Sequence, residues 1–287
     1  MMKLFDAHCH LQDPMILTKA PQLIRTALDN GVLHFAVNGT CENDWHLVKQ
    51  LSDNNPSIIP CFGIHPWFIL DRTPNWMNTL KEFLDRNPCA AIGEIGIDKG
   101  SQGKKIDFSQ QIEVCTKQLE LAKELKKPAS IHCVRAFNDL LQIMKSVGPF
   151  PNGVILHSYL GSAEMVPMFA ELGGYFSFSG FLMSLKESKA RRIVKSVPAE
   201  RLLLETDAPD ALPKMSDKSF PLFMVETDHV GDNETLNHPA NIVTVLDYVA
   251  SLLDMSREEI ADLSYRNAVR LFSYEGSKVL LEQGNTC

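Results

Sequence analysis

The 287-residue sequence lacks long apolar runs, paired cysteines and an excess of positive charge. No apolar segment approaches the roughly 18 residues that a membrane helix needs, and no signal-peptide core precedes the first acidic residue, Asp6. The seven cysteines are odd in number and include no Cys-x-x-Cys pair, so neither a disulfide framework nor a zinc finger is indicated. We expect reduced, mostly buried thiols in a cytoplasmic protein, or alternatively a nuclear one, with no membrane partner.

Positive charge is scarce as well, since 28 lysines and arginines face 35 aspartates and glutamates, for a net charge of −7. Proteins that coat nucleic acid rely on many such cations to contact phosphates, so this class is disfavoured. An enzyme that holds one phosphodiester through metal ions stays compatible with the composition, because net charge does not prevent a local cationic site. Phosphate-loop, dinucleotide-binding and nucleophilic-serine motifs are also missing, which argues against nucleotide cofactors and serine hydrolysis.

What the sequence does contain is a repeated unit, a short apolar run followed by a longer amphipathic stretch. Such runs are typical of parallel strands buried on both faces, and glycine or proline ends most of the helical stretches between them. Eight strands are predicted, at residues 3–7, 33–38, 58–64, 90–97, 128–133, 153–156, 175–179 and 201–205.

Eight strand and helix units predict an α/β fold, a (β/α)8 TIM barrel that forms a single domain over residues 1–287. This number of units in about 250 residues suits a barrel, whereas a doubly wound sheet usually has about five or six strands. A long, polar and acidic loop at 209–237 follows strand eight and is either a functional lid or a solvated insert. Amphipathic patterns over residues 242–272 predict two or three C-terminal helices that close the barrel.

Histidines and acidic residues gather where these strands end, which is where catalytic groups lie in such a barrel. His8 and His10 are two residues apart, so on an extended strand their side chains leave the same face and can reach one metal ion. The other candidate metal ligands follow four further strands, and they are Glu94, His132, His157 and Asp207. Imidazole and carboxylate without thiolate are the ligands of hydrolytic zinc and of manganese, iron or magnesium sites. These six ligands exceed what one tetrahedral ion takes, so two divalent metal ions are predicted, Zn²⁺, Mg²⁺ or Mn²⁺, with Glu94 as a candidate bridge.

Each of these histidines alone could be a polar core residue held by hydrogen bonds or a cap at a strand end. Together they favour the metal interpretation, because several unpaired ionisable groups buried at one axis would each cost several kcal/mol. His65 could ligate, bind a substrate phosphate or support a ligand, and the last two roles are favoured. Glu205 is expected to share a strand face with Asp207, where it either orients a ligand histidine or is a buried structural carboxylate.

Seven short segments resemble the TatD-type metal-dependent deoxyribonucleases, a family of amidohydrolase-like TIM barrels. The resemblance covers almost the whole chain in the family's order, at residues 5–10, 62–66, 91–98, 131–133, 156–158, 204–209 and 267–272. It implies hydrolysis of DNA phosphodiesters, commonly from a 3′ end, with divalent metal held by the six ligand positions named above. The sequence departs from the family at Arg135, which follows the fifth-strand histidine by three positions, and at His238, where a glutamate is common. These departures concern substrate contacts more than metal binding.

The predicted function is therefore a deoxyribonuclease, a 3′–5′ exonuclease in which a metal-activated water attacks phosphorus and DNA ends or single strands are the substrate. Asp207 and Glu94 are the predicted catalytic residues, Asp207 as acceptor of the proton of the water and Glu94 between the ions. Arg135 is a candidate phosphate contact, and the loop at 99–105 is either a second one or a solvated turn.

Two other functions compete with this prediction. A small-molecule amidohydrolase could cleave an amide, ester or lactone on the same binuclear centre, because a metal pair also polarises carbonyls. Such enzymes often bridge the ions with a carbamylated lysine, but here Glu94 occupies the matching strand and residues 91–93 contain no lysine. A non-catalytic binding scaffold would be expected to have lost ligands, and none of the six is missing.

Overall fold

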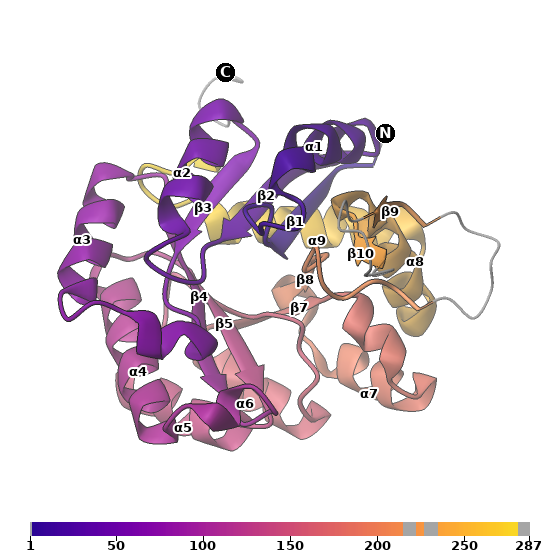
Figure 1. Ribbon diagram of the computed structural model, residues 1–287. Helices are drawn as coiled ribbons and strands as arrows, with labels where there is room; N and C mark the ends of the chain where they lie inside the picture. The colour runs from indigo at the N-terminus through magenta and orange to yellow at the C-terminus, as the bar shows by residue number, and fades with distance from the viewer. Residues whose placement is uncertain (1, 215–221, 227–234, 281–287) are drawn as a thin grey trace.

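Eight parallel strands follow one another around a nearly closed barrel in the computed structural model, which describes residues 2–214, 222–226 and 235–280 (Figure 1). The strands are β1 (Leu4–Cys9), β2 (Val32–Asn38), β3 (Ile58–Phe62), β4 (Ala91–Asp98), β5 (Ala129–Val134), β6 (Val154–Leu156), β7 (Gly174–Phe178) and β8 (Leu202–Leu204). Each pairs in parallel with the next along the chain. The predicted TIM barrel is confirmed, and every observed strand lies within two residues of its predicted bounds.

Helices surround the barrel (Figure 1), and those that connect its strands pack their apolar sides against the outer face of the sheet. Seven helices connect successive strands: α1 (Ala20–Asp29), α2 (Trp45–Asn54), α3 (Trp76–Arg86), α4 (Phe108–Glu124), α5 (Phe137–Val147), α6 (Val166–Glu171) and α7 (Glu187–Ser196). Two more, α8 (Ile242–Leu253) and α9 (Arg257–Phe272), follow β8 in the described part of the chain. Because every connection places a helix outside, each strand directs its carboxyl end toward the same mouth of the barrel.

The barrel closes between its first and last strands at this mouth rather than along a continuous ladder. The backbone N–H of Asp207 donates to the carbonyl of His8 at 2.9 Å, and that of His10 donates to Ala208 at 2.7 Å. Both bonds involve predicted metal ligands, namely His8, His10 and Asp207, and the fourth partner, Ala208, directly follows Asp207. The closure of the barrel therefore fixes β1 against the segment after β8 at the candidate site.

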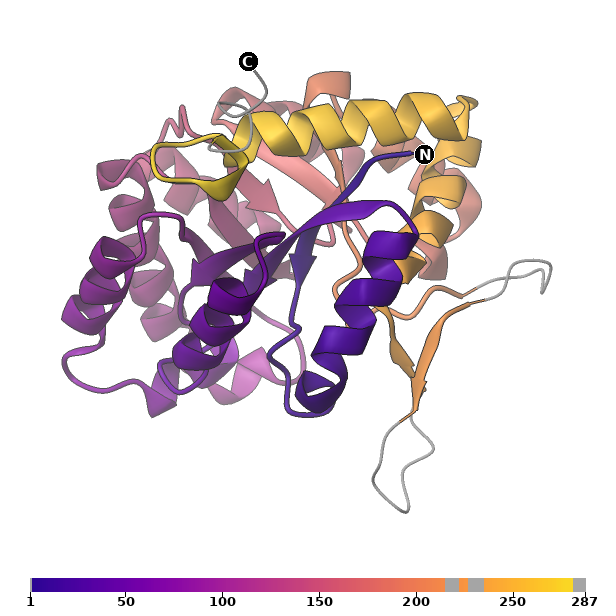
Figure 2. The same cartoon turned by 90° about the horizontal axis from the view of Figure 1, so that it is seen from above.

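The opposite, amino end of the barrel is filled by apolar side chains and covered by α9. The rings of Phe5 and Phe272 stack at a centroid distance of 5.0 Å, and Tyr175 and Leu203 belong to the same buried cluster. Ser256 and Glu259 form a capping box that starts α9 by satisfying its free backbone N–H groups. Figure 2 shows this long helix lying across the end of the barrel. The predicted closure of the barrel by C-terminal helices is thus confirmed for α9.

The segment after β8 was expected to be irregular, and this is wrong in part. Strand β9 (Met224–Glu226) pairs in antiparallel fashion with β10 (Thr235–Asn237), and the resulting hairpin projects from the barrel (Figure 2). Its base is held by Asn241, whose side chain bonds the backbone N–H and carbonyl of Phe223 at 2.9 and 2.7 Å. The remainder of the predicted loop, residues 215–221 and 227–234, lies outside the described residues.

The cysteines of the described segments are all free thiols, as expected. Three are buried, Cys9, Cys61 and Cys115, and three are partly buried, Cys41, Cys89 and Cys133. Fewer thiols are therefore fully buried than the sequence suggested. A search of the same described residues for a helix long and apolar enough to cross a bilayer finds none.

Candidate metal centre

Glu94 lies at the centre of the candidate site, at a point where β4 bulges and two glycines flank it closely. The pairing of β4 with β5 shifts register between Ile92 and Ile95. A Cβ on Gly93 would lie 2.3 Å from the side-chain oxygen of Asn38, and one on Gly96 would lie 2.0 Å from the carbonyl of His132. Both glycines also have positive φ angles, 154° and 145°, which side chains rarely tolerate. These close approaches are what bring the Glu94 carboxylate to the barrel axis.

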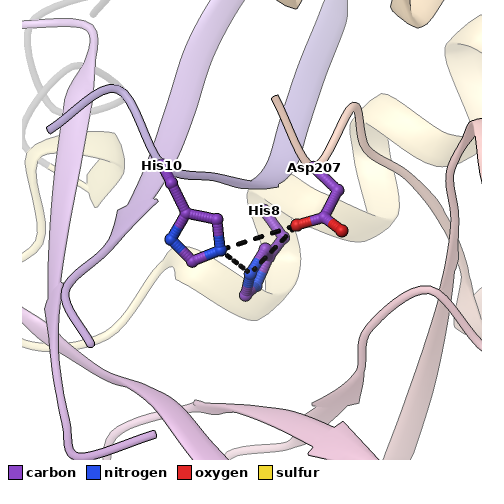
Figure 3. A group of neighbouring side chains, drawn as sticks. All are labelled: His8, His10 and Asp207. Atoms are coloured by element: carbon purple, nitrogen blue, oxygen red, sulfur yellow. Dashed lines mark hydrogen bonds and ion pairs between the residues drawn. The ribbon is translucent and has the colours of Figure 1, made fainter. Parts of the chain in front are cut away.

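One oxygen of Glu94 faces the residues that come from β1 and from the segment after β8. Its Oε2 is 3.6 Å from Nε2 of His8 and 3.2 Å from Nε2 of His10. The Asp207 Oδ1 completes this group, at 3.7 and 3.5 Å from the same two nitrogens. Figure 3 shows the two imidazoles and the Asp207 carboxylate pointing toward one another. The sequence spacing of His8 and His10 therefore brings their rings together, as predicted.

The other oxygen of Glu94 faces the histidines of the opposite wall. Its Oε1 is 3.0 Å from Nδ1 of His132 and 3.0 Å from Nε2 of His157. Those two nitrogens are 3.3 Å apart. All six predicted ligands thus converge, with one group at each oxygen of Glu94. The two groups are in contact, because the rings of His8 and His157 stack at a centroid distance of 4.0 Å.

The far nitrogens of these rings are held by partners that orient the rings toward the centre. His10 Nδ1 lies 2.8 Å from the carbonyl oxygen of Asn38. Because a carbonyl can only accept, Nδ1 must carry the hydrogen, which leaves the lone pair of Nε2 directed at Glu94 and His8. His8 Nδ1 is likewise held by the Ser130 hydroxyl at 2.7 Å. Ligand histidines in metal sites are typically oriented in this way.

His132 and His157 are held by carboxylates instead. His132 Nε2 lies 3.4 Å from Oδ2 of Asp98. His157 Nδ1 lies 3.5 Å from Oε1 of Glu205, which is close enough for an ionic contact, although this nitrogen forms no hydrogen bond. Such carboxylate partners raise the basicity of the nitrogen that faces a metal.

The carboxylates of the cluster favour the binding of positive charge, either as protons on the histidines or as metal ions. Burial alone would raise the pKa of Glu94, but the surrounding histidines, His65 and His157 first, hold it well below its ordinary value. Burial would likewise lower the pKa values of His10 and His157, yet the nearby carboxylates keep both well above the ordinary histidine value. Without metal the cluster therefore collects protons, which divalent cations would displace because metals bind deprotonated ligands.

The donor set fits divalent metal on these observations. Two pairs of imidazole nitrogens lie 3.1 and 3.3 Å apart, an arrangement that repels unless a proton or a cation stands between them. Three groups in the described residues have donor atoms within 4.8 Å of one another, and they are His8 with His10 and Asp207, His8 with His157 and Glu205, and His65 with Glu94 and His132. Every donor is imidazole nitrogen or carboxylate oxygen, as hydrolytic metal sites require.

His65 is close to the cluster but is directed differently. Its Nδ1 accepts a hydrogen bond from the backbone N–H of Trp67 at 3.1 Å. Burial lowers the pKa of His65 to about 3, so the neutral ring carries its hydrogen on Nε2, which lies 3.5 Å from Oε1 of Glu94. In this tautomer Nε2 would donate rather than ligate, although His65 also belongs to a group of donor atoms with Glu94 and His132. Support of a ligand and contact with a substrate phosphate both stay predictions for His65.

The expectation that Glu205 and Asp207 share a strand face is wrong. Strand β8 ends at Leu204, and Asp207 has a φ of 56°, so the backbone turns between the two carboxylates. Glu205 points into the barrel, where its Oε1 accepts from the backbone N–H and hydroxyl of Ser158 at 2.6 and 2.7 Å. The Ser177 hydroxyl donates to its other oxygen. Glu205 therefore holds the segment that carries His157.

Of the candidate phosphate contacts, Arg135 is available and Lys99 is engaged. Arg135 follows β5 directly, is exposed, and forms no recorded ion pair or hydrogen bond with any described side chain. Lys99 donates to Asp139 at 2.7 Å and lies over the ring of Phe108 at 4.2 Å. Of the predicted loop, Lys99 is thus a structural contact rather than a free cation.

Two residues of the site were not singled out from the sequence, Asp98 and Trp67. Asp98 accepts from the indole N–H of Trp67 and from the backbone of Gly100, in addition to its contact with His132. Despite burial, the bonds from His132 and Trp67 lower the pKa of Asp98 to about 2. The alternation of side chains along β4 could have identified Asp98, because residues 94, 96 and 98 of a strand lie on the same face. No sequence signal pointed to Trp67.

Comparisons with known proteins point to one family. The family model described as TatD related DNase matches residues 5–273. A Bacillus subtilis protein named uncharacterized metal-dependent hydrolase YabD is 30% identical over 269 residues, covering 94% of this chain and 98% of the relative. The human protein named deoxyribonuclease TATDN3 is 25% identical over 281 residues, covering 94% of each chain.

Solved structures match the fold over nearly the same span. The crystal structure of YjjV, a TatD homologue from Escherichia coli, has a TM-score of 0.81 and 25% identity, covering 94% of this chain and 98% of its own. A TatD family hydrolase from Entamoeba histolytica has a TM-score of 0.82 at 20% identity, with the same coverage. Both structures cover almost the whole barrel described above.

Proposed function

This chain belongs to the family of TatD-related DNases, and from that membership we propose that it is a deoxyribonuclease with two divalent metal ions. It is a metal-dependent hydrolase of this family. The proposed substrate is a DNA phosphodiester, cleaved from the 3′ end of a single strand or a frayed duplex. Support comes from the relatives that are named deoxyribonucleases and from the arrangement of the site.

One observation carries the proposal, the division of the two Glu94 oxygens between separate groups of histidines. Oε2 lies with His8 and His10, and Oε1 lies with His132 and His157, so a single carboxylate could bridge two ions. A lone structural ion pair would not need four imidazoles in two sets. When bound, divalent ions of the Zn²⁺, Mg²⁺ or Mn²⁺ type lower the pKa of water toward neutrality and neutralise phosphate charge.

The side chains of the protein then have distinct tasks. Asp207 is the proposed acceptor of the proton of the attacking water, since its Oδ1 lies 3.5 Å from Nε2 of His10 inside the ligand group. Burial would raise the pKa of Asp207, but His10 and the neighbouring histidines lower it, which keeps the carboxylate ionised and able to accept. Arg135 is the proposed phosphate contact, because its guanidinium is exposed at the mouth and a planar fork suits phosphate oxygens. His65 is proposed to support Glu94, because its Nε2 lies 3.5 Å from Oε1 of that carboxylate.

The test is a digestion series on oligonucleotides labelled at the 3′ or the 5′ end, in single- and double-stranded form. Protein stripped with chelator is reloaded with each of several divalent ions, and products are resolved by length. We expect no cleavage by the stripped protein, restoration by at least one ion, and stepwise shortening from the 3′ end. Fewer than one bound ion per chain in protein purified without chelator would contradict the binuclear proposal.

A parallel assay separates the amidohydrolase alternative. The reloaded protein is offered bis-p-nitrophenyl phosphate together with a panel of esters and lactones, each with and without EDTA. We expect metal-dependent turnover of the phosphodiester and little turnover of the carbonyl substrates. The reverse ranking would overturn the phosphodiesterase assignment and leave the metal site intact.

A further inference from the structure

Trp67 is the one tryptophan of the chain that reaches solvent. Trp45 is fully buried and Trp76 is 7% exposed, whereas Trp67 is 44% exposed. Trp67 lies in the short helical segment Pro66–Asp71 directly after β3, at the mouth that holds the metal centre. A large ring left in water next to a hydrolytic site lacks a role in the chemistry described so far.

The ring is held rigidly although much of its surface is open. Its indole N–H donates to Oδ2 of Asp98, the same oxygen that contacts His132. The ring is nearly perpendicular to that of His65, at a centroid distance of 4.9 Å and an interplanar angle of 86°. Because the N–H of the indole is satisfied and His65 packs against the ring, the indole is oriented in advance while 44% of the residue stays open to a ligand.

Trp67 is close enough to the metal centre to contact a base of the nucleotide that is cut, rather than a remote part of the substrate. The centroid of Trp67 is 6.0 Å from that of His132, whose Nδ1 faces Glu94. A group stacked on the indole therefore belongs to the same nucleotide as the phosphate at the metal centre, or to its immediate neighbour. Stacking on an aromatic ring is sequence-tolerant, because every base has a flat face, and it contributes about 1–3 kcal/mol per base.

We propose that Trp67 is the stacking platform for the nucleobase next to the phosphate that is cut, an inference that rests on the proposed function and specifies its substrate. A base can reach an open ring only when it is not stacked inside a duplex. Trp67 consequently selects for single strands and frayed ends that carry a base, without selecting among the four bases. The indole N–H of Trp67 and the His132 imidazole contact the same carboxylate, that of Asp98, so a base bound to Trp67 would lie near His132.

The proposal is tested by binding of a short single-stranded oligonucleotide with phosphorothioate linkages, which resist hydrolysis, to the metal-loaded protein. A matched oligonucleotide carries abasic residues in place of the terminal nucleotides. We expect the base-containing strand to quench tryptophan fluorescence and the abasic strand to leave it unchanged. Since the other two tryptophans are buried, the quenched signal should disappear in Trp67→Phe.

Affinities from fluorescence anisotropy of labelled strands give the second readout. Trp67→Ala is expected to weaken binding of the base-containing strand roughly 5- to 100-fold, as the loss of one stacked base implies. The abasic strand should bind Trp67→Ala and the wild type equally. Trp67→Phe should lose less affinity than Trp67→Ala, because it keeps one aromatic ring for stacking, although it lacks the second ring of the indole and the N–H that bonds Asp98. Leu70→Ala, in the same segment and 62% exposed, is the matched control and should change neither affinity.

Equal binding of the two strands by the wild type, or unchanged binding by Trp67→Ala, would overturn the platform. The cleavage assay tests the proposed nuclease function independently of the stacking proposal. Stacking without cleavage under any metal would contradict the nuclease and support the platform. Cleavage of abasic and base-containing ends at the same rate would contradict the platform and support the nuclease.

Discussion

The two ends of the barrel are built from the same strands and are equally buried, yet they differ completely in chemistry. β1 contributes Phe5 to the amino end and His8 to the carboxyl end. β4 contributes Ala91 at one end and Glu94 at the other. The amino end is covered by α9 and contains aromatic and aliphatic side chains, whereas the carboxyl end gathers histidines and carboxylates.

The difference shows how one architecture separates stability from function. Burial of apolar surface at the amino end stabilises the fold by roughly 25 cal/mol per Å². Burial of ionisable groups at the carboxyl end opposes folding unless each is paired or binds a metal. A change at the amino end should therefore lower the free energy of unfolding without altering metal binding. A change at the carboxyl end should weaken metal binding more than it alters the free energy of unfolding.

The largest effect is expected for Glu94→Gln. The amide is nearly the same size but has one oxygen and no charge, so it cannot serve both groups of histidines. We expect at least a roughly thousandfold loss of hydrolysis together with loss of bound metal, and no loss of helical signal by circular dichroism. Glu113→Gln, at an exposed position of α4, is the control. Near-wild-type turnover with full metal content would show that Glu94 has no such role.

Phe272→Ala tests the other end of the barrel. Phe272 is 1% exposed and stacks on Phe5, so truncation leaves a cavity under α9 and should cost about 3–5 kcal/mol in the free energy of unfolding. Denaturant unfolding measures this loss, and metal content per folded molecule should stay at the wild-type level. Met255→Ala, 39% exposed before α9, is the control. A parallel loss of metal would mean that the two ends are coupled.

Asp98→Asn should have an intermediate effect, confined to the mouth. Removing the charge that faces His132 weakens the orientation of that imidazole, and such changes typically reduce metal affinity about 10- to 100-fold. Competition with a fluorescent chelator measures the affinity. Asp139→Asn, the partner of Lys99 on the same face, should leave it unchanged. An unaltered affinity in Asp98→Asn would remove this residue from the site.

The most gradual expected effect is the pH dependence of the metal-free protein. The pKa values of His10 and His157 lie well above 6.5 in the folded state, so the folded protein retains protons that the unfolded chain releases. Their contribution to stability is complete below pH 6.5 and is lost as pH rises through the higher folded pKa values. Glu94 and Asp207 do not oppose this trend, because their lowered pKa values leave them ionised in both states there.

Thermal unfolding of EDTA-treated protein between pH 6.5 and about 8 measures this effect, with a slope of up to about 1.4 kcal/mol per pH unit for each titrating histidine. Metal-loaded protein should show the opposite trend, since deprotonated ligands hold metal more tightly. The same slope with and without metal would indicate that these histidines are not ligands. Phe272→Ala should lower both curves without changing either slope.

Much of the fold and of the site was predictable because the relevant signals are local. The alternation of apolar runs and amphipathic helices predicted the strands to within two residues, and the position of each histidine after a strand predicted its convergence on the mouth. The hairpin of β9 and β10 was not predicted, because each strand is three residues long and gives no periodic signal. The turn between Glu205 and Asp207 was missed for a related reason, since a single residue with positive φ has no sequence signature here.

The sequence by itself determined which kinds of atoms meet at the mouth, because strand periodicity and strand order place a side chain without reference to distant residues. Only the tertiary structure decided how those atoms are divided and oriented. The two oxygens of Glu94 face different histidines, and Ser130 orients His8 across 122 positions of sequence. Trp67 acquires its place beside the site through Asp98, 31 positions away. Such contacts arise where separate strands pack, and neither composition nor periodicity along one strand contains them.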